Sequence, residues 1–279
     1  MKPAPFDYAV PDHLAEALEL LAQHGEAARP LAGGQSLAAM LNMRLVTPRV
    51  VVDISRLEEL DAIKAQRHGL EVGAAVTQER LYRWPGLVEC QPLLHQVLPW
   101  VGHYPTRQRG TVCGSIAHSD PSSELPLALA VLGGEVVLQS RRGVRTLPVA
   151  EFQLGMLRTA TAPDELITAV RFPPLPTKAV SRFREVGQRH GDFALVALAV
   201  VADADWIRIG VGGVADVPAV KNLPGDIAGH DLVAALNEFA WTLEGYDDKH
   251  ASARYRRQLV RRLGKQLIEE ARGALSFGT

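Results

Sequence analysis

Two glycine-rich turns hold the residues whose types and spacing best suit ligand binding. The first is Ala32-Gly33-Gly34-Gln35-Ser36, and the second is Thr111-Val112-Cys113-Gly114-Ser115. Glycine lacks a Cβ atom, so the backbone can turn sharply there and bring its N–H groups close to a ligand. Several N–H groups that point one way beside a helix N-terminus bind phosphate oxygens. Two such turns predict a ligand with more than one phosphate, held from two sides.

The segments around each turn are those that a phosphate-binding loop needs. Pro30-Leu31-Ala32 is typical of a short strand, and Ser36 can cap a helix that begins at Leu37. Before the second turn, residues 102–110 are expected to form a loop; after it, an apolar helix is expected from Leu125 to Leu132. Taken alone, the first turn could equally be an ordinary tight connection between a strand and a helix.

Hydrophobic periodicity and turn residues predict the remaining elements. Helices are expected at 12–23, 93–101, 232–243 and 252–272. A further short helix is expected to begin after Thr77, which would cap it. Strands are expected at 50–54, 70–74, 135–139, 145–149, 181–185, 195–202 and 206–211. The proline cluster at 173–176 favours extended structure and marks the clearest domain boundary.

Composition narrows the classes of function. The chain has 279 residues, 47% hydrophobic and 22% charged, with a formal net charge of -1, so nothing overall favours nucleic acid or an anionic membrane. No apolar run approaches a membrane span, and the first residues lack a signal-peptide core, so we expect a cytoplasmic protein. The two cysteines, Cys90 and Cys113, cannot supply the four thiolates of a typical iron–sulfur cluster. A redox function would therefore need an organic cofactor here.

Several other features favour ordinary structural interpretations. Residues 210–215 match the dinucleotide pattern G-x-G-x-x-A, but Asp216-Val217-Pro218 does not open the helix that a Rossmann fingerprint requires, so we expect a strand end. We interpret His118 as structural and Cys113 as a small inward-pointing residue. The last helix should bury an apolar stripe (Tyr255, Leu259, Leu263 and Leu267) and expose a solvated basic face (Arg254, Arg256, Arg257, Arg261, Arg262 and Lys265).

Taken together, these residues resemble the FAD-binding (medium) subunit of molybdenum hydroxylases, the family of xanthine dehydrogenases and bacterial carbon monoxide dehydrogenases. The matching segments cover nearly the whole length: 30–37, 52–54, 109–121, 124–126, 191–194 and 251–257. The main departure is Cys113, where the family usually has a second glycine. That replacement is harmless at negative φ and costly at positive φ.

The resemblance implies an α+β fold: two FAD-binding subdomains of the vanillyl-alcohol-oxidase (PCMH) type, followed by a C-terminal α/β domain. The implied ranges are 1–55, 56–176 and 177–279. Backbone N–H groups of both turns would hold the FAD pyrophosphate, Asp120 would lie near the ribose or adenine, and Phe193 near the isoalloxazine. The implied cofactor-binding residues are Ala32, Gly33, Gly34, Gln35, Ser36, Leu37, Thr106, Gly110, Thr111, Val112, Cys113, Gly114, Ser115, Asp120 and Phe193.

The resemblance also implies partners. A large molybdenum-cofactor subunit would hydroxylate the substrate, and a small iron–sulfur subunit would pass electrons to FAD on this chain, which would release them to an external acceptor. The complex would be a heterotrimer or a dimer of heterotrimers, and this chain would supply no metal ligand and no acid, base or nucleophile. Two alternatives stay open: a self-contained FAD-dependent oxidase and a non-redox nucleotide-binding module.

Overall fold

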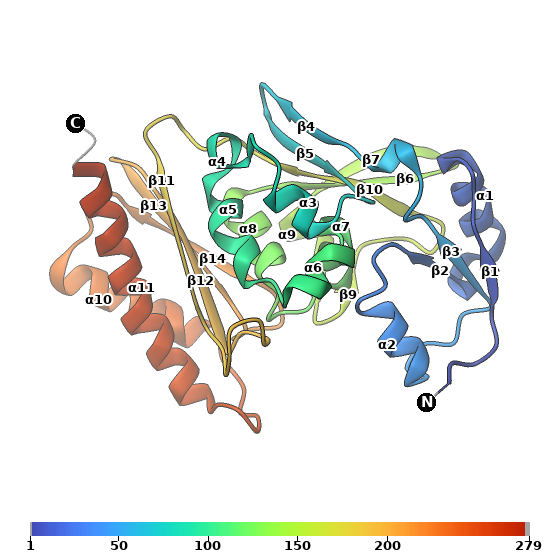
Figure 1. Ribbon diagram of the computed structural model, residues 1–279. Helices are drawn as coiled ribbons and strands as arrows, with labels where there is room; N and C mark the ends of the chain where they lie inside the picture. The colour runs from blue at the N-terminus through green and yellow to red at the C-terminus, as the bar shows by residue number, and fades with distance from the viewer. Residues whose placement is uncertain (1, 277–279) are drawn as a thin grey trace.

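Within residues 2–276, which the computed structural model describes, three β-sheets of three, five and four strands follow one another along the chain (Figure 1). The first sheet is parallel, with β3 (Val50–Asp53) between β1 (Asp7–Ala9) and β2 (Ala28–Leu31). Helix α1 (Leu14–His24) packs against β2 and β3, and Gly25 ends it at φ +51° as expected for a C-terminal stop. Helix α2 (Leu37–Asn42) follows the first glycine turn.

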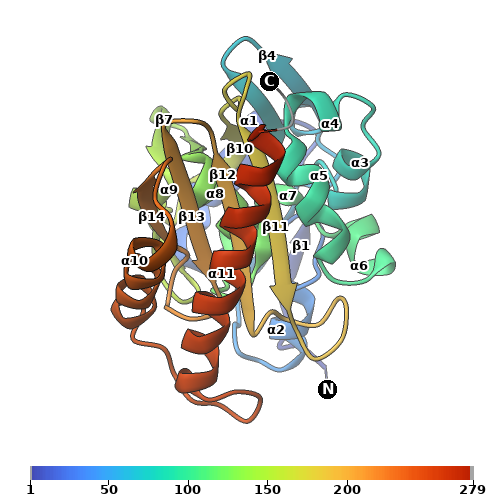
Figure 2. The same cartoon turned by 90° about the vertical axis from the view of Figure 1, so that its left-hand side faces the viewer.

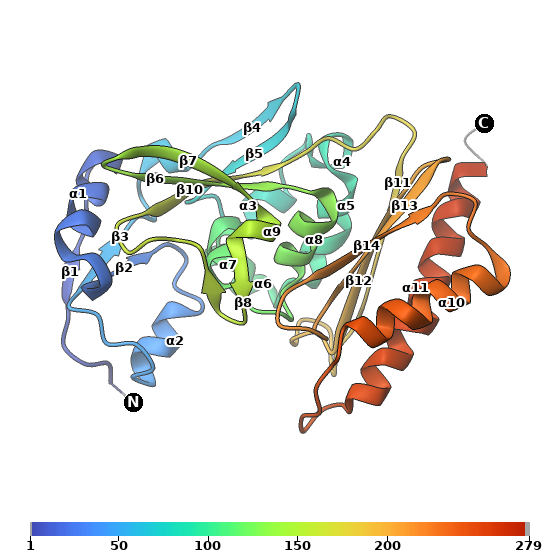
Figure 3. The same cartoon turned by 180° about the vertical axis from the view of Figure 1, so that it is seen from behind.

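The second sheet is antiparallel, in the order β4 (Ile63–Gln66), β5 (Gly69–Gly73), β10 (Leu166–Phe172), β6 (Glu135–Ser140), β7 (Gly143–Pro148). A two-strand ribbon, β8 (Gln153–Gly155) with β9 (Arg158–Thr159), follows the hairpin β6–β7. Helices lie on one face of this sheet (Figures 1 and 3), where α7 packs against β5 and β10. They are α3 (Gln78–Tyr82), α4 (Leu87–Cys90), α5 (Pro92–Val97), α6 (Tyr104–Arg109), α7 (Val112–His118), α8 (Glu124–Leu132) and α9 (Val149–Phe152).

The third sheet is an antiparallel meander of β11 (Val180–Val186), β12 (Val196–Ala202), β13 (Trp206–Gly212) and β14 (Ala219–Pro224). Helices α10 (Gly229–Thr242) and α11 (Ala253–Ser276) cover one face (Figure 2), and α8 packs against β12 and β13. Every residue of β12 is buried. Its alternate side chains enter two different hydrophobic cores, because successive strand residues point to opposite faces. The third sheet therefore forms the wall between those cores.

Most predicted helices and strands are confirmed, including the Thr77 cap, whose Oγ1 accepts a hydrogen bond from the Arg80 N–H at 3.2 Å. The expected loop at 102–110 is wrong, because α6 occupies most of it and packs against α3. Gly102, Pro105 and Gly110 gave that segment the composition of a loop, yet Pro105 lies in the first turn, where a missing N–H is tolerated.

The last helix also differs from expectation. Arg256 is only 1% exposed, whereas Tyr255 is 44% exposed. The buried face of α11 is Arg256, Val260, Gly264, Leu267, Ile268 and Ala271, so the inward stripe is rotated by about one residue from the expected one. Arg256 is therefore not part of the solvated basic face. Among the described residues, no helix combines the length and apolar character that a bilayer crossing requires.

The dinucleotide-like pattern at 210–215 has the expected structure. Gly210 and Gly212 lie in β13, and Gly213 turns the chain at φ +79° without opening a helix. The three sheets lie within 7–53, 63–172 and 180–224. Each sheet with its helices forms one unit of the chain. Because one hydrophobic core runs through the first two units and reaches β12, the division into domains at residues 55 and 176 stays a proposal.

Candidate functional site

A cleft of about 1390 Å³ is lined by loops that follow strands and helices of all three units. It is large enough for a dinucleotide-sized ligand. Of the residues expected to bind a cofactor, those that line it are Ala32, Gly33, Gly34, Gln35, Ser36, Leu37, Thr106, Gly110, Thr111, Cys113, Gly114, Ser115, Asp120 and Phe193. Val112 does not line it: its side chain is fully buried in the core.

The first glycine turn presents unused backbone donors to this cleft. Among the described residues, the N–H groups from Gly33 to Leu37 have no hydrogen-bond acceptor, while the carbonyls of Gly34 and Ser36 already accept helical bonds from Ala38 and Met40. Gly34 has φ +72°, which glycine adopts without strain. Ser36 is at the expected N-cap position, but its side chain makes no capping bond. Its hydroxyl is thereby left for a ligand.

The second glycine turn is used more by the protein itself. The Val112 N–H donates to the Val76 carbonyl at 3.1 Å, and the Gly114 N–H donates to Thr111 Oγ1 at 3.0 Å. The Ser115 N–H donates to the Thr111 carbonyl at 3.2 Å. In the described part of the chain, the N–H groups of Thr111 and Cys113 have no acceptor. The second turn thus has fewer donors for phosphate than its sequence predicts.

The first glycine turn meets the C-terminal end of α6, directly before the second turn, backbone to backbone. A Cβ atom on Gly33 would lie 2.0 Å from the Arg109 carbonyl oxygen and 2.7 Å from Gly110 Cα. Backbone atoms cannot move aside as a flexible side chain can, so only glycine allows this approach. The result is a narrow cradle with free N–H groups on one side and the α7 N-terminus on the other. The unused N–H groups and the close approach of the two backbone segments suit the binding of a pyrophosphate.

Cys113 replaces the usual family glycine without strain. The described residues with positive φ do not include it, and its side chain is buried, with Sγ 3.4 Å from the Val72 carbonyl oxygen. Burial raises the pKa of the Cys113 thiol far above its usual range.

We expect a thiol reagent such as DTNB to label Cys90 in the native protein and to leave Cys113 unmodified at about pH 8, since only the thiolate reacts. Cys90 is partly exposed and Cys113 is buried. The measurement is the number of thiols that react before and after unfolding, with Cys90→Ala as the control. Rapid reaction of both thiols in the folded chain would contradict the buried position of Cys113.

Asp120 lies in a turn that forms part of the wall of the cleft. Its Oδ1 accepts a hydrogen bond from the Ser122 N–H at 2.8 Å, and within the described chain Oδ2 has no partner. The hydroxyls of Ser115 and Ser123 lie 3.0 Å apart beside it. His118, interpreted from sequence as structural, also lines the cleft from the last turn of α7. A carboxylate oxygen in this position can accept hydrogen bonds from sugar hydroxyls.

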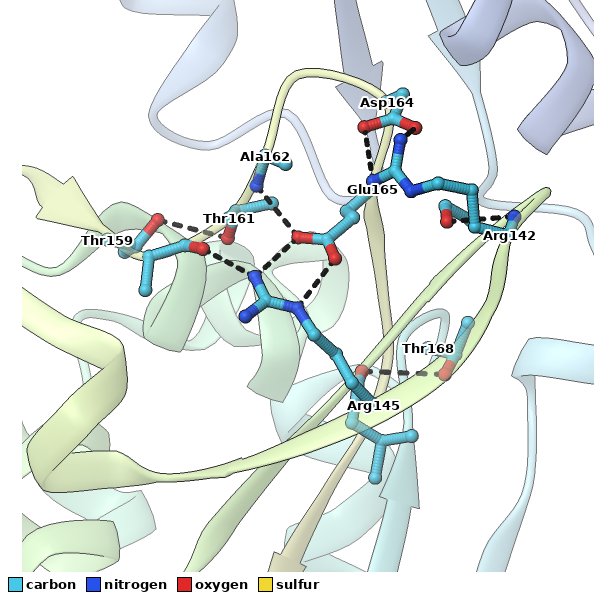
Figure 4. Close-up of polar contacts among 11 residues, drawn as sticks. Arg142, Arg145, Thr159, Thr161, Ala162, Asp164, Glu165 and Thr168 are labelled. Atoms are coloured by element: carbon cyan, nitrogen blue, oxygen red, sulfur yellow. Dashed lines mark hydrogen bonds and ion pairs between the residues drawn. The ribbon is translucent and has the colours of Figure 1, made fainter.

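A wall of the cleft that the sequence did not predict is built around an ion pair (Figure 4). Arg145 on β7 meets Glu165 in a two-point contact, Nε to Oε1 at 2.6 Å and Nη2 to Oε2 at 2.7 Å. Arg145 also donates to the Ala160 carbonyl, and Glu165 accepts from the Ala162 N–H. The Arg145 guanidinium, opposed by burial, holds the pKa of Glu165 below its usual range. The pair thereby fixes residues 159–165, most of which line the cleft.

Replacing Arg145 by methionine should lower the free energy of unfolding by about 1–3 kcal/mol, because it leaves the Glu165 carboxylate without its charged partner. The Glu165 side chain is only 5% exposed. Urea unfolding at neutral pH measures the change. The matched control is Arg145→Met with Glu165→Leu, which removes both charges and should be less destabilised; equal losses in both variants would contradict a role for the ion pair.

The acid dependence of the Arg145–Glu165 ion pair follows from the lowered pKa of Glu165. The pair stabilises the fold fully above the carboxyl's unfolded pKa, and this stabilisation is lost as pH falls through the lower folded pKa.

The third unit contributes to the same cleft. Phe193 lies in the loop between β11 and β12 and is 70% exposed. Gly191 in this loop has φ +86°, and a Cβ there would lie 2.5 Å from His103 Nδ1, so the loop touches the segment before α6. Tyr246, Asp248, His250 and Arg256 also line the cleft, although the sequence did not predict them as site residues. Their place in the site depends on the packing of α11 and could not be read from local spacing.

Two buried carboxyl groups lie beside the cleft. Glu124 begins α8 and lines the cleft, whereas Glu185 lies on β11, where its Oε2 is buried without a hydrogen-bond partner among the described residues. Burial raises the pKa of Glu185 to about 8. Burial, together with the carboxylates of Glu185 and Asp120, raises the pKa of Glu124 well above its usual range. Both groups are therefore neutral at mildly acid pH.

The fold and cleft agree with the comparison with known families. The family described as "FAD binding domain in molybdopterin dehydrogenase" matches residues 4–175, which is more than half of the chain. This chain belongs to that family, and its cofactor is FAD. It is an oxidoreductase chain of the medium-subunit type found in molybdenum hydroxylase-type dehydrogenases.

Individual relatives match over nearly the full length. The alpha subunit of the 6-hydroxypseudooxynicotine dehydrogenase complex of Paenarthrobacter nicotinovorans is 34% identical over 97% of this chain and 96% of its own. The carbon monoxide dehydrogenase medium chain of Afipia carboxidovorans is 32% identical over 98% of both chains. In the solved structure of quinoline 2-oxidoreductase from Pseudomonas putida 86, a chain superposes with a TM-score of 0.91 at 32% identity, covering 99% of this chain and 100% of that one. These similarities confirm the family resemblance.

The residues present fit FAD. The Gly33 cradle would receive the pyrophosphate, and the unused N–H groups from Gly33 to Leu37 supply the donors that phosphate oxygens require. Asp120 offers an acceptor for ribose hydroxyls, and the cleft extends from this turn to the Phe193 loop. The individual role of each of these residues stays a prediction.

Proposed function

We propose that this chain is the FAD-carrying electron-transfer subunit of a heteromeric molybdenum hydroxylase. It takes electrons from iron–sulfur clusters of a small partner subunit and passes them to an external acceptor, while a large molybdenum-cofactor subunit carries out the hydroxylation. The assembly is a heterotrimer or a dimer of heterotrimers in the cytoplasm. The observation that carries the proposal is the cradle at Gly33, where the first glycine turn meets the end of α6 beside unused backbone donors.

FAD, when bound, supplies the redox chemistry, and the protein supplies binding, orientation and electrostatics. The N–H groups of Gly33 to Leu37 would hold the pyrophosphate, and Asp120 would orient the ribose or adenine end. The Arg145–Glu165 pair keeps the wall at 159–165 in place. Phe193 would lie near the isoalloxazine, and its 70% exposure would leave that end of the cleft open to another protein or an acceptor.

The names of the relatives support the assignment to a complex, since one is called a subunit of a dehydrogenase complex and another a medium chain. The inward position of Cys113 argues against the self-contained oxidase in the form that joins flavin covalently to a cysteine, because this thiol lies beside β5 and is buried. The intact cradle argues against a module that has lost its cofactor.

The test is purification from the native host at low salt, followed by the visible spectrum, gel analysis of co-purifying chains and metal analysis. Flavin absorbance with a large molybdenum-containing and a small iron–sulfur chain is the expected result. A yellow protein that is alone and reduces oxygen with its own substrate would instead establish the oxidase. A colourless chain that takes up no added FAD would overturn both flavin functions.

A further inference from the structure

Arg256, in the first turns of α11, is among the largest fully buried side chains of the described protein. A buried guanidinium is strongly unfavourable unless charge partners and hydrogen-bond acceptors surround it. The family motif at 251–257 contains this residue, but neither the motif nor the expected basic face explains why an arginine should be inside. Its contacts give the explanation.

The Arg256 guanidinium joins three separate segments. Nη1 donates to the carbonyl of Leu195 at 2.6 Å and to that of Gly213 at 2.8 Å. Nη2 lies 2.6 Å from the Asp248 carboxylate, and the guanidinium carbon lies 4.6 Å from the centre of the Tyr246 ring. Because the guanidinium is planar and its donors diverge at fixed angles, these partners are held at fixed relative positions.

Two of these segments run directly to residues of the FAD cleft. Leu195 is two residues after Phe193 in the same loop. Gly213 donates its N–H to the Pro121 carbonyl at 2.7 Å, which connects it to the turn that contains Asp120. Arg256 therefore bridges the loop at one end of the cleft and the turn at another.

The glycine pattern at 210–215 makes this bridge possible. Gly213 has φ +79°, and a Cβ there would lie 2.9 Å from the Leu195 carbonyl oxygen and 3.0 Å from that of Ala194. Only glycine lets the two carbonyl-bearing segments approach closely enough for one guanidinium to bond both. The sequence that resembles a dinucleotide fingerprint thus has a different use here.

We propose that Arg256 is a positioning residue for FAD, which sets the distance between the Phe193 loop and the Asp120 turn across the cleft. The inference rests on the proposed function, because it assigns Phe193 and Asp120 to FAD binding. Arg256 itself is among the residues that line the cleft, and it is only 1% exposed, so it acts on a ligand through the segments that it holds rather than by direct contact.

The test compares FAD binding and protein stability in the full-length chain. FAD is removed, and titration with added FAD gives its Kd; the visible circular dichroism of bound FAD reports the surroundings of the ring. Both are measured well below the melting temperature of each variant, and near-ultraviolet circular dichroism checks the fold of the FAD-free chain. The variants are Arg256→Met, Arg256→Lys and Gly213→Ala.

We expect Arg256→Met to weaken FAD binding by about tenfold or more and to change the visible circular dichroism, since small displacements of binding groups have large effects. Arg256→Lys should recover part of the affinity, because an ammonium group can bond some but not all of the acceptors. Gly213→Ala leaves the charge in place but separates the same two segments, so it should reproduce the change. It also keeps the test decisive if Arg256→Met fails to fold.

The matched control is Arg261→Met on the same helix. Arg261 donates to Asn237 Oδ1 at 2.8 Å, and it does not line the cleft. This variant should lose stability without a change in FAD affinity or in the spectrum. Phe193→Ala should change the spectrum with little effect on the melting temperature, since Phe193 is 70% exposed.

The outcomes separate the two proposals. A native chain that binds no FAD would overturn the proposed function. If the native chain binds FAD but folded Arg256→Met and Gly213→Ala match its affinity and spectrum, the positioning role is wrong and the proposed function stands. Equal effects of Arg261→Met and Arg256→Met on affinity would show that general destabilisation, not positioning, lowers FAD binding, and would equally overturn the inference.

Discussion

Gly33→Ala should abolish most FAD binding while leaving the chain folded. The added methyl group would lie 2.0 Å from the Arg109 carbonyl oxygen, so the first glycine turn and the end of α6 must move apart. Overpacking of this kind costs about 1–3 kcal/mol of folding stability. The proposed pyrophosphate cradle depends on this close contact, and we therefore expect FAD affinity to fall by at least about a hundredfold, or roughly 2.7 kcal/mol.

The measurement is the FAD content of the purified variant and its Kd for added FAD, with urea unfolding to record stability. Gly273→Ala is the matched control, because among the described residues a Cβ on Gly273 in α11 would meet nothing within 4 Å outside its own helix backbone and its chain neighbours. Alanine is also the better helix former, so the control should be as stable as the native chain or slightly more so. Native FAD content in Gly33→Ala would show that the cradle is not the binding site.

Glu185→Gln should stabilise the protein at about pH 8 and change it little at about pH 5. Burial raises the pKa of Glu185 to about 8 in the folded chain. In the unfolded chain the carboxyl loses its proton near its usual pKa of about 4.3. Between these values the folded state retains a proton that the unfolded state releases, so native stability falls as pH rises through this window and levels off above it.

The Glu185→Gln variant has no carboxyl group at this position to lose a proton. Its free energy of unfolding should therefore fall less than that of the native chain as pH rises from about 5 to about 8. We expect a melting temperature about 5 °C above that of the native chain at about pH 8. Glu124 shares the raised pKa, so some slope should remain until Glu124→Gln is added. Glu151→Gln on the exposed side of α9 is the control and should leave the profile unchanged. A native chain whose melting temperature rises from about pH 5 to about pH 8 would contradict burial of neutral acids.

The sequence predicted the parts of the site that depend on local chemistry. Glycines before a helix start are visible in a short window, and both turns were found in this way. The contact between Gly33 and Arg109 was not predicted, because it joins segments far apart in the chain and depends on α6, which had the composition of a loop. The resemblance to a family supplied Phe193, which no local pattern singles out, whereas Asp120 follows closely after the second turn in the sequence.

Elements whose pattern departs from simple alternation were missed. Strand β10, at the centre of the second sheet, is buried on both faces and has an irregular register between Ile167 and Ala169, so its period is broken. Strand β4 lies at the sheet edge and is mostly exposed, which leaves it little hydrophobic signal. The buried Arg256 was assigned to the solvated face because charge, read locally, predicts exposure. Its burial is explained only by the hydrogen-bond acceptors that the folded chain places around it.

The position of α8 has a consequence for synthesis on the ribosome. This helix is buried almost all round, and part of its cover is β12 and β13, which lie more than sixty residues later in the chain. Gly210 on β13 even allows Val131 to approach to a distance that any Cβ would prevent. During synthesis, the apolar surface of α8 therefore stays exposed to solvent until the third sheet has left the ribosome. A nascent chain halted after residue 176 should consequently bind chaperones.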